Sequence, residues 1–352
     1  MSGGELRVAI VGYGLAGRAF HAPLVAATEG MRVSAIVTAD PGRAKAARRE
    51  HPGARIAASA DALWERPGDL DLVVVAAPNR AHVPLARAAI ERGIAVVVDK
   101  PLAATAAEGR ALADEARARG VMLSVFHNRR WDGDFLTLRR LLAEGALGAP
   151  TRLESRFDRW RPQVDPANWR ERHDPADAGG LLADLGSHLI DQAIVLFGRP
   201  VAVYAELDAR RPGARVDDDC FVALTHPGGE RSHLWASMLA ADDPPRFRLV
   251  GRGGVYVKHG LDPQEAAIRA GERPGPGWGR EPEEAWGRLW DGTGSRAVPT
   301  EPGDYPAFYG GVARALRLGE PPPVDPADAV AGLEVIEEAR RSASPASAAM
   351  SS

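Results

Sequence analysis

The chain has 352 residues, more than a typical single domain holds, so two domains are expected. Hydrophobic residues make up 45% and charged residues 26% of the sequence, an ordinary balance for a globular protein. The formal net charge of -3 gives no general attraction to nucleic acid or to an anionic membrane, so neither partner is expected.

The apolar runs and the cysteine content give no sign of secretion or of a membrane span. The apolar run centred on Val8 to Val11 is shorter than the core of a signal peptide, and no later run reaches the roughly 18 residues of a membrane span. Cys220 is the only cysteine, so an intrachain disulfide cannot form and a cluster of thiolate metal ligands is excluded. A cytoplasmic location is therefore expected.

The first 126 residues alternate between short apolar segments and segments of helical character. Strands are expected at 6–11, 31–37, 70–76, 94–98 and 121–126, and helices at 18–27, 41–51, 59–66, 82–92 and 105–119. Strands that alternate with helices predict a parallel sheet with helices on both faces, the doubly wound Rossmann architecture.

After about residue 150 the pattern changes to strands with few helices between them. These strands are expected at 151–157, 201–207, 220–225, 232–239, 246–250 and 255–258. They predict an α+β domain with a large, open, mostly antiparallel sheet. Residues 271–303, rich in Gly, Pro and Trp, are expected to form a long loop.

The expected domain boundaries follow from this change of pattern. The Rossmann domain is expected to span 1–126, and the α+β domain, with substrate and oligomer contacts, 127–341. Its last helix could pack back on the first domain. The small, polar residues 342–352 are expected to form a mobile tail.

A glycine-rich turn, Gly12-Tyr13-Gly14-Leu15-Ala16-Gly17, joins the first strand to the first helix. Gly12 permits a tight turn, Gly14 lets a pyrophosphate approach the backbone, and Gly17 lets the helix pack close to the strand. The N–H groups at the helix start, around Leu15 and Ala16, suit phosphate oxygens. An ordinary glycine-rich turn is the alternative, but the alternating strands and helices that follow favour a dinucleotide site.

The end of the second strand is expected to select the dinucleotide. NAD sites usually place an acid there to accept from the ribose 2′-hydroxyl, and this chain has Thr38. A neutral hydroxyl does not repel a 2′-phosphate, and Arg43 could add positive charge. Asp40, slightly displaced, is the competing ribose acid and would favour NAD. We expect NADP, with NAD as the alternative.

Three more segments follow in chain order: 77–82 (Ala-Pro-Asn-Arg-Ala-His), 99–102 (Asp-Lys-Pro-Leu) and 179–188 (Gly-Gly-Leu-Leu-Ala-Asp-Leu-Gly-Ser-His). With the glycine turn, they resemble the glucose–fructose oxidoreductase/inositol dehydrogenase/rhizopine-catabolism (Gfo/Idh/MocA) family. Segments 126–132, 157–160 and 258–265 are similar to a narrower branch that contains NADP-dependent scyllo-inositol dehydrogenases. The chain departs from the family pattern at Ala178, often a glycine, and at Asp99, more commonly a glutamate.

The resemblance implies oxidation of an alcohol, which needs a hydride acceptor, a base and a group that supports developing oxyanion charge. Lys100 follows a parallel strand at the edge where open α/β sheets bind ligands, and the family implies that it contacts the hydroxyl and relays its proton. Pro101 restricts the backbone before it and could aim the lysine. A surface lysine paired with Asp99 is the alternative.

Asp184 and His188 stand four residues apart, so on a helix they share one face. Asp184 could bind substrate or orient His188, and His188 could serve as the general acid and base because imidazole ionises near neutrality. A structural ion pair is the alternative; Lys100 and the resemblance favour catalysis. Asp191, one turn on, could support them or be solvated. No metal is expected, because a hydride transfer assisted by lysine needs no Lewis acid.

Contacts with the remaining groups are also expected. Pro78 and Asn79 are expected to touch the cofactor together with Lys100, and His82 to stabilise the turn beside the nicotinamide. Aromatic and hydrogen-bonding side chains suited to a polyol ring are His127, Arg129, Trp131, Phe157, Arg159 and Trp160. Packing is the alternative for the tryptophans. Lys258 could reach either the cleft or a subunit interface.

The sequence thus predicts NADP(H)-dependent oxidation of a ring hydroxyl of a cyclitol or sugar, or reduction of the matching ketone. A dihydrodiol-, xylose- or aldose-type dehydrogenase is an alternative, and so is a cofactor- or sugar-sensing regulator on the same fold. A regulator should lack the lysine and the Asp/His pair, which are present here. The open sheet face needs a cover, so a homodimer or homotetramer is expected.

Overall fold

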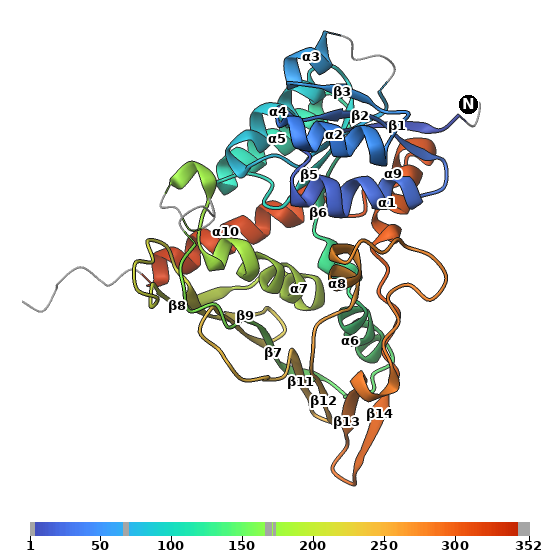
Figure 1. Cartoon of the computed structure of the whole chain (residues 1–352). Helices are drawn as coiled ribbons and strands as arrows, with labels where there is room; N and C mark the ends of the chain where they lie inside the picture. The colour runs from blue at the N-terminus through green and yellow to red at the C-terminus, as the bar shows by residue number, and fades with distance from the viewer. Residues whose placement is uncertain (1–3, 66–69, 166–170, 172–173, 344–352) are drawn as a thin grey trace, which may run out of the picture. The chain divides into compact units, whose positions relative to one another are not determined.

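The structure is a computed structural model that describes residues 4–65, 70–165, 171 and 174–343 (Figure 1). The expected tail, 342–352, therefore lies outside the described residues beyond position 343. The chain divides into two compact units, and each is built from three separate stretches. Unit 1 contains residues 1–132, 263–279 and 303–330, and unit 2 contains 133–262, 280–302 and 331–352.

Unit 1 is built on a six-stranded parallel sheet with the order β3-β2-β1-β4-β5-β6. Its strands are β1 (Leu6–Val11), β2 (Met31–Val37), β3 (Arg55–Ala57), β4 (Leu72–Val75), β5 (Ala95–Asp99) and β6 (Leu123–Phe126). Valine, isoleucine and leucine dominate because the central strands are covered on both faces; all four residues of β4 are buried. The strand order reverses between β1 and β4, and such a point is where open α/β sheets bind ligands.

The helices of unit 1 begin at recognisable signals. Asp40 accepts from Arg43 N at 2.7 Å and caps one helix, and a reciprocal capping box of Thr105 and Glu108 starts another. The helical segments are η1 (Ala16–His21), α1 (Ala22–Ala27), α2 (Pro41–Glu50), α3 (Ala60–Trp64), η2 (Asn79–Ala81), α4 (His82–Ile90), α5 (Ala106–Ala118), η3 (Asn128–Trp131), α8 (Gln264–Arg269) and α9 (Pro306–Leu318). The boundary between the units falls within α10 (Pro326–Ala343).

Unit 2 is built on an eight-stranded sheet with the order β14-β13-β12-β11-β7-β10-β9-β8. Its strands are β7 (Pro150–Asp158), β8 (Ala202–Asp208), β9 (Asp219–Thr225), β10 (Arg231–Ser237), β11 (Phe247–Gly251), β12 (Val255–Lys258), β13 (Gly287–Trp290) and β14 (Ser295–Val298). β7 and β10 run parallel, and the other neighbouring strands of the sheet run antiparallel. The expected fold class is confirmed.

The expectation of a loop over 271–303 is wrong in its second half. β13 and β14 form an antiparallel hairpin there, and β13 pairs with β12 to extend the sheet. Alternate residues of β13, Arg288 and Trp290, are exposed, and the strand has only four residues. This short edge hairpin lacks the apolar run by which the other strands were predicted.

One face of the unit 2 sheet is covered and the other is open. Helices α6 (Gly133–Ala143), α7 (Ser187–Phe197) and the later part of α10 contribute to one hydrophobic core with the inward residues of the sheet, such as Leu153, Leu189 and Val335. Shorter segments are η5 (Pro175–Asp177), η6 (Leu182–Gly186) and η7 (Glu283–Ala285). Within the described part of the chain, no helix combines the length and apolar character that a membrane crossing needs.

Candidate active site

The glycine turn lies between β1 and η1, at the switch point of the unit 1 sheet. Gly12 has a φ of +100°, and a Cβ there would lie 2.4 Å from the Ala76 carbonyl oxygen. A Cβ on Gly17 would lie 1.9 Å from the Gly12 oxygen, so only glycine permits this close packing. A Cβ built on Gly14 would meet no tertiary neighbour closer than Arg43 Nη1, at 3.8 Å, so the backbone of Gly14 is open to approach.

The helix after the turn begins as a π-helix, η1, and becomes α-helical only at Ala22. The sequence predicted an ordinary helix over 18–27. π-turns are rare in proteins and frequent at functional sites. Leu15, just before η1, is 53% exposed. The first N–H groups of a helix have no acceptor within it, so this start fits the phosphates of a dinucleotide.

Tyr13 anchors the turn in a way that the sequence analysis missed. Its hydroxyl donates to Glu50 Oε2 at 2.9 Å, and Arg18 Nη2 lies 2.6 Å from Glu50 Oε1. The hydrogen bond from Arg18 lowers the pKa of Glu50 to about 2. Burial raises the pKa of Tyr13, so it stays a neutral donor. The turn is thereby tied to the end of α2.

The residues expected to choose between NAD and NADP lie after β2. Thr38 is nearly buried, and its hydroxyl oxygen lies 3.4 Å from Asp40 N. Asp40, the competing ribose acid, uses Oδ1 to cap α2. The Arg43 guanidinium extends from the first turn of α2 to the side of Gly14. A cation therefore stands beside the glycine turn.

His82 ties together the loops that follow β4 and β5. Its ring is buried, with Nδ1 2.7 Å from Pro101 O and Nε2 2.8 Å from Ala77 O. Asn79, in the short helix just before it, is buried, and Pro78 precedes that helix. The segment around Pro78 is therefore held against the segment that contains Lys100.

Lys100 follows β5 directly, and its peptide bond to Pro101 is cis. Its backbone N donates to Asp99 Oδ1 at 2.9 Å. Burial alone would raise the pKa of Asp99. The combined effect of neighbouring His21, His82 and Lys100 is larger and lowers this pKa below its usual value. Asp99 is thus an ionised carboxylate beside Lys100.

The spacing of Asp184 and His188 suggested one face of a single helix. In the structure of unit 2 they lie in two consecutive helical segments. Asp184 lies in the π-helix η6, and His188 lies in α7, which follows it directly. His188 is buried, with its ring 6.4 Å from the ring of Phe157. Asp191, for which solvation was one interpretation, is also buried.

The six residues expected to bind substrate have different surroundings. In unit 1, His127 is buried; Arg129 is buried and forms ion pairs with Asp132 and Glu265, and Trp131 packs edge-on against Phe308. These contacts favour a structural role for Arg129.

In unit 2, Phe157 belongs to the core, whereas Trp160 is 59% exposed. The backbone N of Arg159 donates to Ser237 O at 2.8 Å. Lys258 is fully buried and lies 3.1 Å from Glu281 Oε1. Of these residues, Trp160 has the exposure that a ligand contact needs.

A parallel sheet with a glycine turn at its switch point and a lysine at the end of β5 defines a dinucleotide-binding oxidoreductase. Residues 6–127 match the "Oxidoreductase family, NAD-binding Rossmann fold", and residues 135–257 match the "GFO/IDH/MocA C-terminal domain". The chain belongs to the Gfo/Idh/MocA family of oxidoreductases, as the resemblance indicated.

Individual relatives cover almost the whole chain. The uncharacterized oxidoreductase YdgJ of Escherichia coli K12 is 43% identical over 343 residues, 95% of each chain. scyllo-Inositol 2-dehydrogenase (NADP(+)) IolW of Bacillus subtilis 168 is 36% identical over 342 residues, 96% of this chain and 93% of IolW. The solved structure of yvaA from Bacillus subtilis has a TM-score of 0.92 at 35% identity and covers 97% of both chains.

Proposed function

We propose that this oxidoreductase transfers hydride between NADP(H) and a secondary ring hydroxyl, or the matching ketone, of a cyclitol or sugar. The observation that carries the proposal is Lys100, placed directly after β5 in a chain that is 36% identical to a scyllo-inositol 2-dehydrogenase. In the oxidative direction a secondary alcohol and NADP⁺ give a ketone, NADPH and a proton.

Lys100, Asp184 and His188 are the residues to which we assign the proton chemistry. When bound, the nicotinamide accepts the hydride. In the oxidative direction neutral Lys100 would accept the hydroxyl proton, and the ammonium so formed would support negative charge on the substrate oxygen and pass that proton on. His188 exchanges the proton as general base or acid, and Asp184 binds substrate or sets the orientation of His188.

The preference for NADP rests on Thr38, Asp40 and Arg43. A carboxylate near the adenosine ribose would repel a 2′-phosphate, and Thr38 puts a neutral hydroxyl at the position where NAD sites usually have one. Asp40 is engaged at the N-terminus of α2, and the Arg43 guanidinium lies beside Gly14. Arginine suits phosphate because its planar group offers several donors.

On the substrate side, Trp160 offers the best-supported contact because its ring is exposed. Stacking of an aromatic face on the apolar face of a sugar ring fits a cyclitol or sugar. His127, Trp131 and Arg159 stay proposed contacts, while Arg129 and Phe157 fit a supporting role. A dihydrodiol-, xylose- or aldose-type dehydrogenase is the alternative activity, and fold alone does not decide among them.

For the homo-oligomer, we propose that the open face of the unit 2 sheet pairs with a second copy. A row of neighbours, Arg156, Trp235, Phe221 and Glu206, crosses four strands on this face. The Arg156 guanidinium lies 3.9 Å from the centre of the Trp235 ring, and the Phe221 ring is 5.1 Å away. An aromatic row of this kind is typical of interfaces.

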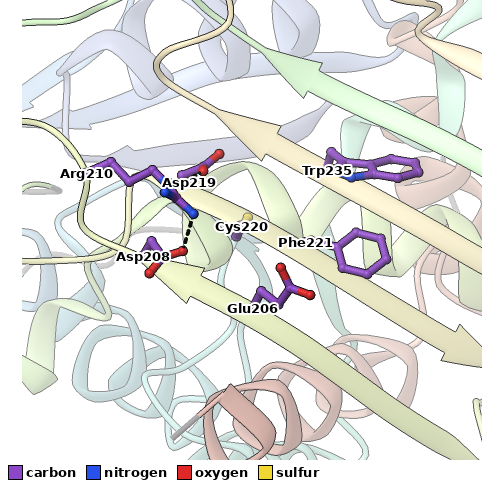
Figure 2. Close-up of a pocket in the computed structure, with 7 residues that line it drawn as sticks. All are labelled: Glu206, Asp208, Arg210, Asp219, Cys220, Phe221 and Trp235. Carbon is purple, nitrogen blue, oxygen red and sulfur yellow. Dashed lines mark hydrogen bonds and ion pairs between the residues drawn. The ribbon is translucent and has the colours of Figure 1, made fainter. Parts of the chain in front are cut away.

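Charge on the open face supports a two-fold pairing. Arg152 and Arg231 are cross-strand partners at one end of the strands, where Arg152 also pairs with Glu154. Asp219 and Asp208 are partners at the other end, where both pair with the single Arg210 and leave an excess of negative charge. The acidic end borders a pocket of about 250 Å³ between Glu206 and Trp235 (Figure 2). A two-fold axis through the middle of the face would bring the basic end of each copy to the acidic end of the other.

A cofactor-coupled panel tests the activity, with scyllo-, myo- and chiro-inositol, aldohexoses and pentoses, each with NADP and NAD. We expect turnover of a cyclitol or sugar with NADP. Binding of cofactor without turnover of any substrate would favour the sensing regulator. A preference for NAD would contradict the argument from Thr38. Sedimentation of the intact chain tests the oligomer, and a monomer would contradict it. The cytoplasmic location stays a prediction.

A further inference from the structure

Three consecutive aspartates, Asp217, Asp218 and Asp219, lead into β9 in unit 2. Asp219 pairs with Arg210 at 2.6 Å beside the pocket on the open face (Figure 2). The other two side chains hold different segments of unit 2. Both of those segments carry residues that the proposed function uses.

Asp217 holds the start of the helical segment that carries Asp184. Its carboxylate accepts from Leu182 N at 2.6 Å, and its backbone oxygen accepts from Leu181 N at 2.8 Å. Leu182 is the first residue of η6. Gly180 precedes it with a φ of +102°, and a Cβ there would lie 2.1 Å from Asp217 Oδ1. Asp217 therefore fixes where the turn that leads to His188 begins.

Asp218 orients Arg211, and both side chains are buried. The Asp218 carboxylate accepts from Arg210 N at 2.8 Å, from Arg211 N at 3.2 Å and from Arg211 Nε at 2.9 Å. This set of bonds leaves Asp218 no freedom to turn, so the guanidinium that it holds is also fixed in direction.

Arg211 in turn holds the chain just after Trp160. Its Nη1 donates to the carbonyl oxygens of Arg161 and Gln163, both at 3.2 Å, and its Nη2 donates to Glu171 at 3.3 Å. The five donors of a guanidinium allow one side chain to hold all three acceptors. Lysine could keep the charge but could not reproduce this fork.

We propose that Asp217 and Arg211 are positioning residues for the reaction, a proposal that rests on the proposed function. Asp217 sets the place of Asp184 and His188, and Arg211, locked by Asp218, sets the place of the Trp160 segment. Because the two anchors start from adjacent residues, one short stretch of chain fixes the spacing between the proton-transfer helix and the substrate contact.

Kinetics of Asp217 and Arg211 variants separate the two roles. Asp217→Ala should lower kcat about 10- to 100-fold with KM for the substrate within about two-fold, because the proton-transfer groups are displaced. Asp217→Asn keeps an oxygen that can accept from Leu182 N, so it should restore most of kcat. Arg211→Lys should raise KM about ten-fold and leave kcat within about two-fold.

Two controls show that the rest of the chain is intact. Asp243→Asn changes an exposed aspartate in the loop after β10 and should leave all constants unchanged. NADPH affinity, measured by fluorescence, should be the same in every variant, because unit 1 carries the cofactor residues. The proposal is overturned if Asp217→Asn is as slow as Asp217→Ala, or if Arg211→Lys lowers kcat without changing KM.

Hydrogen exchange of the full chain without substrate provides a second measurement. Asp217→Ala should speed exchange of the Leu182 amide, and Arg211→Lys should speed exchange of the Arg161 amide, which donates to Met238 O. If the unmodified protein turns over no alcohol or ketone of the panel, the proposed function fails, and exchange alone decides this proposal. Unchanged exchange in both variants then overturns it.

Discussion

His21 Nδ1 lies 2.7 Å from the hydroxyl oxygen of Tyr309, which follows it by 288 residues in the sequence. The other ring nitrogen, Nε2, lies 3.9 Å from Asp99 Oδ1. Both His21 and Tyr309 are fully buried. A polar line thus runs within unit 1 from α9, through the end of η1, to the carboxylate beside Lys100.

Removal of the hydroxyl at the end of this line should weaken unit 1. Tyr309→Phe leaves His21 Nδ1 buried without its partner, so we expect a loss of about 1–3 kcal/mol in the free energy of unfolding. Urea denaturation measures it. Thr293→Val, which removes an exposed hydroxyl that donates to Asp291 in the turn between β13 and β14, is the control and should change stability by less than about 0.5 kcal/mol. Equal effects of the two changes would contradict a special role for the buried bond.

Substitution of Lys100 should stop the chemistry without preventing cofactor binding. Lys100→Met and His188→Asn should each lower kcat by about 10²- to 10⁴-fold, the range found when a proton-transfer group is removed. Stopped-flow measurement of NADPH formation gives the rate, and cofactor fluorescence shows whether NADPH still binds. Lys45→Met, on the exposed side of α2, is the control. Full turnover by either variant would rule out the assigned roles.

Arg43→Ala should reduce the preference for NADP. The guanidinium beside Gly14 is expected to meet the 2′-phosphate, and loss of a charge-assisted contact of this kind costs about 1.5–3 kcal/mol, or about 10- to 150-fold in kcat/KM for NADP. The value for NAD should stay within about three-fold. Lys45→Ala again serves as the control. An equal fall with both nucleotides would show that Arg43 acts on the shared part of the cofactor.

Ala178 is a site at which the protein can be stabilised. Its φ is +45°, in the left-handed region that costs a residue with a Cβ about 1 kcal/mol. Ala178→Gly relieves this strain and should raise the free energy of unfolding by up to about 1 kcal/mol. The gain is not larger because glycine also has more freedom in the unfolded chain, which opposes it. Ala176→Gly, in η5, has no such strain to relieve and should not raise the free energy of unfolding. Thermal and urea unfolding measure both.

Glu50 should make stability depend on acid. Its pKa is about 2 in the folded chain, against an ordinary value of 4.5, and the first cause is its hydrogen bond with Arg18. A lowered folded pKa gives stability that is complete above about pH 5 and lost as the pH falls toward 2. Because Arg18 is half exposed, we expect a contribution of about 1–2 kcal/mol.

Comparison with Glu50→Gln isolates this contribution. The difference in unfolding free energy between the unmodified chain and the variant should be constant from about pH 5.5 to 8 and shrink below about pH 4.5. Glu91→Gln, at an exposed site, should show no such trend. A difference that does not change with pH would mean that the carboxylate contributes through packing alone.

Much of the fold could be predicted because buried strands and helix faces require apolar residues at regular positions in the sequence. β1 and β2 have the expected bounds, 6–11 and 31–37, since apolar residues, several of them β-branched, predominate in each and both end in an apolar run. β3 has only three residues and was missed for that reason. The π-turns could not be predicted, because an extra residue per turn leaves the apolar pattern almost unchanged over so short a segment.

The site was predictable where one local motif holds the chemistry, as at Gly12, Gly14 and Gly17. It was not predictable where residues from distant segments meet. His21 with Tyr309, and Arg211 with Arg161, are pairs that only the folded chain brings together. Arg129 was expected at the substrate because arginine suits a polyol, and its ion pair with Asp132 gives it a partner that composition could not reveal.

The interleaving of the two units has a consequence for synthesis of the chain. Phe126, at the end of β6, packs against Phe308 of α9 with ring centres 5.0 Å apart, so part of the cover of β6 in unit 1 comes from a segment near the end of the chain. A ribosome has made most of the protein before that helix emerges. We therefore expect unit 1 to begin folding early in synthesis and to complete its core only after the late segments that contain α8 and α9 have been made.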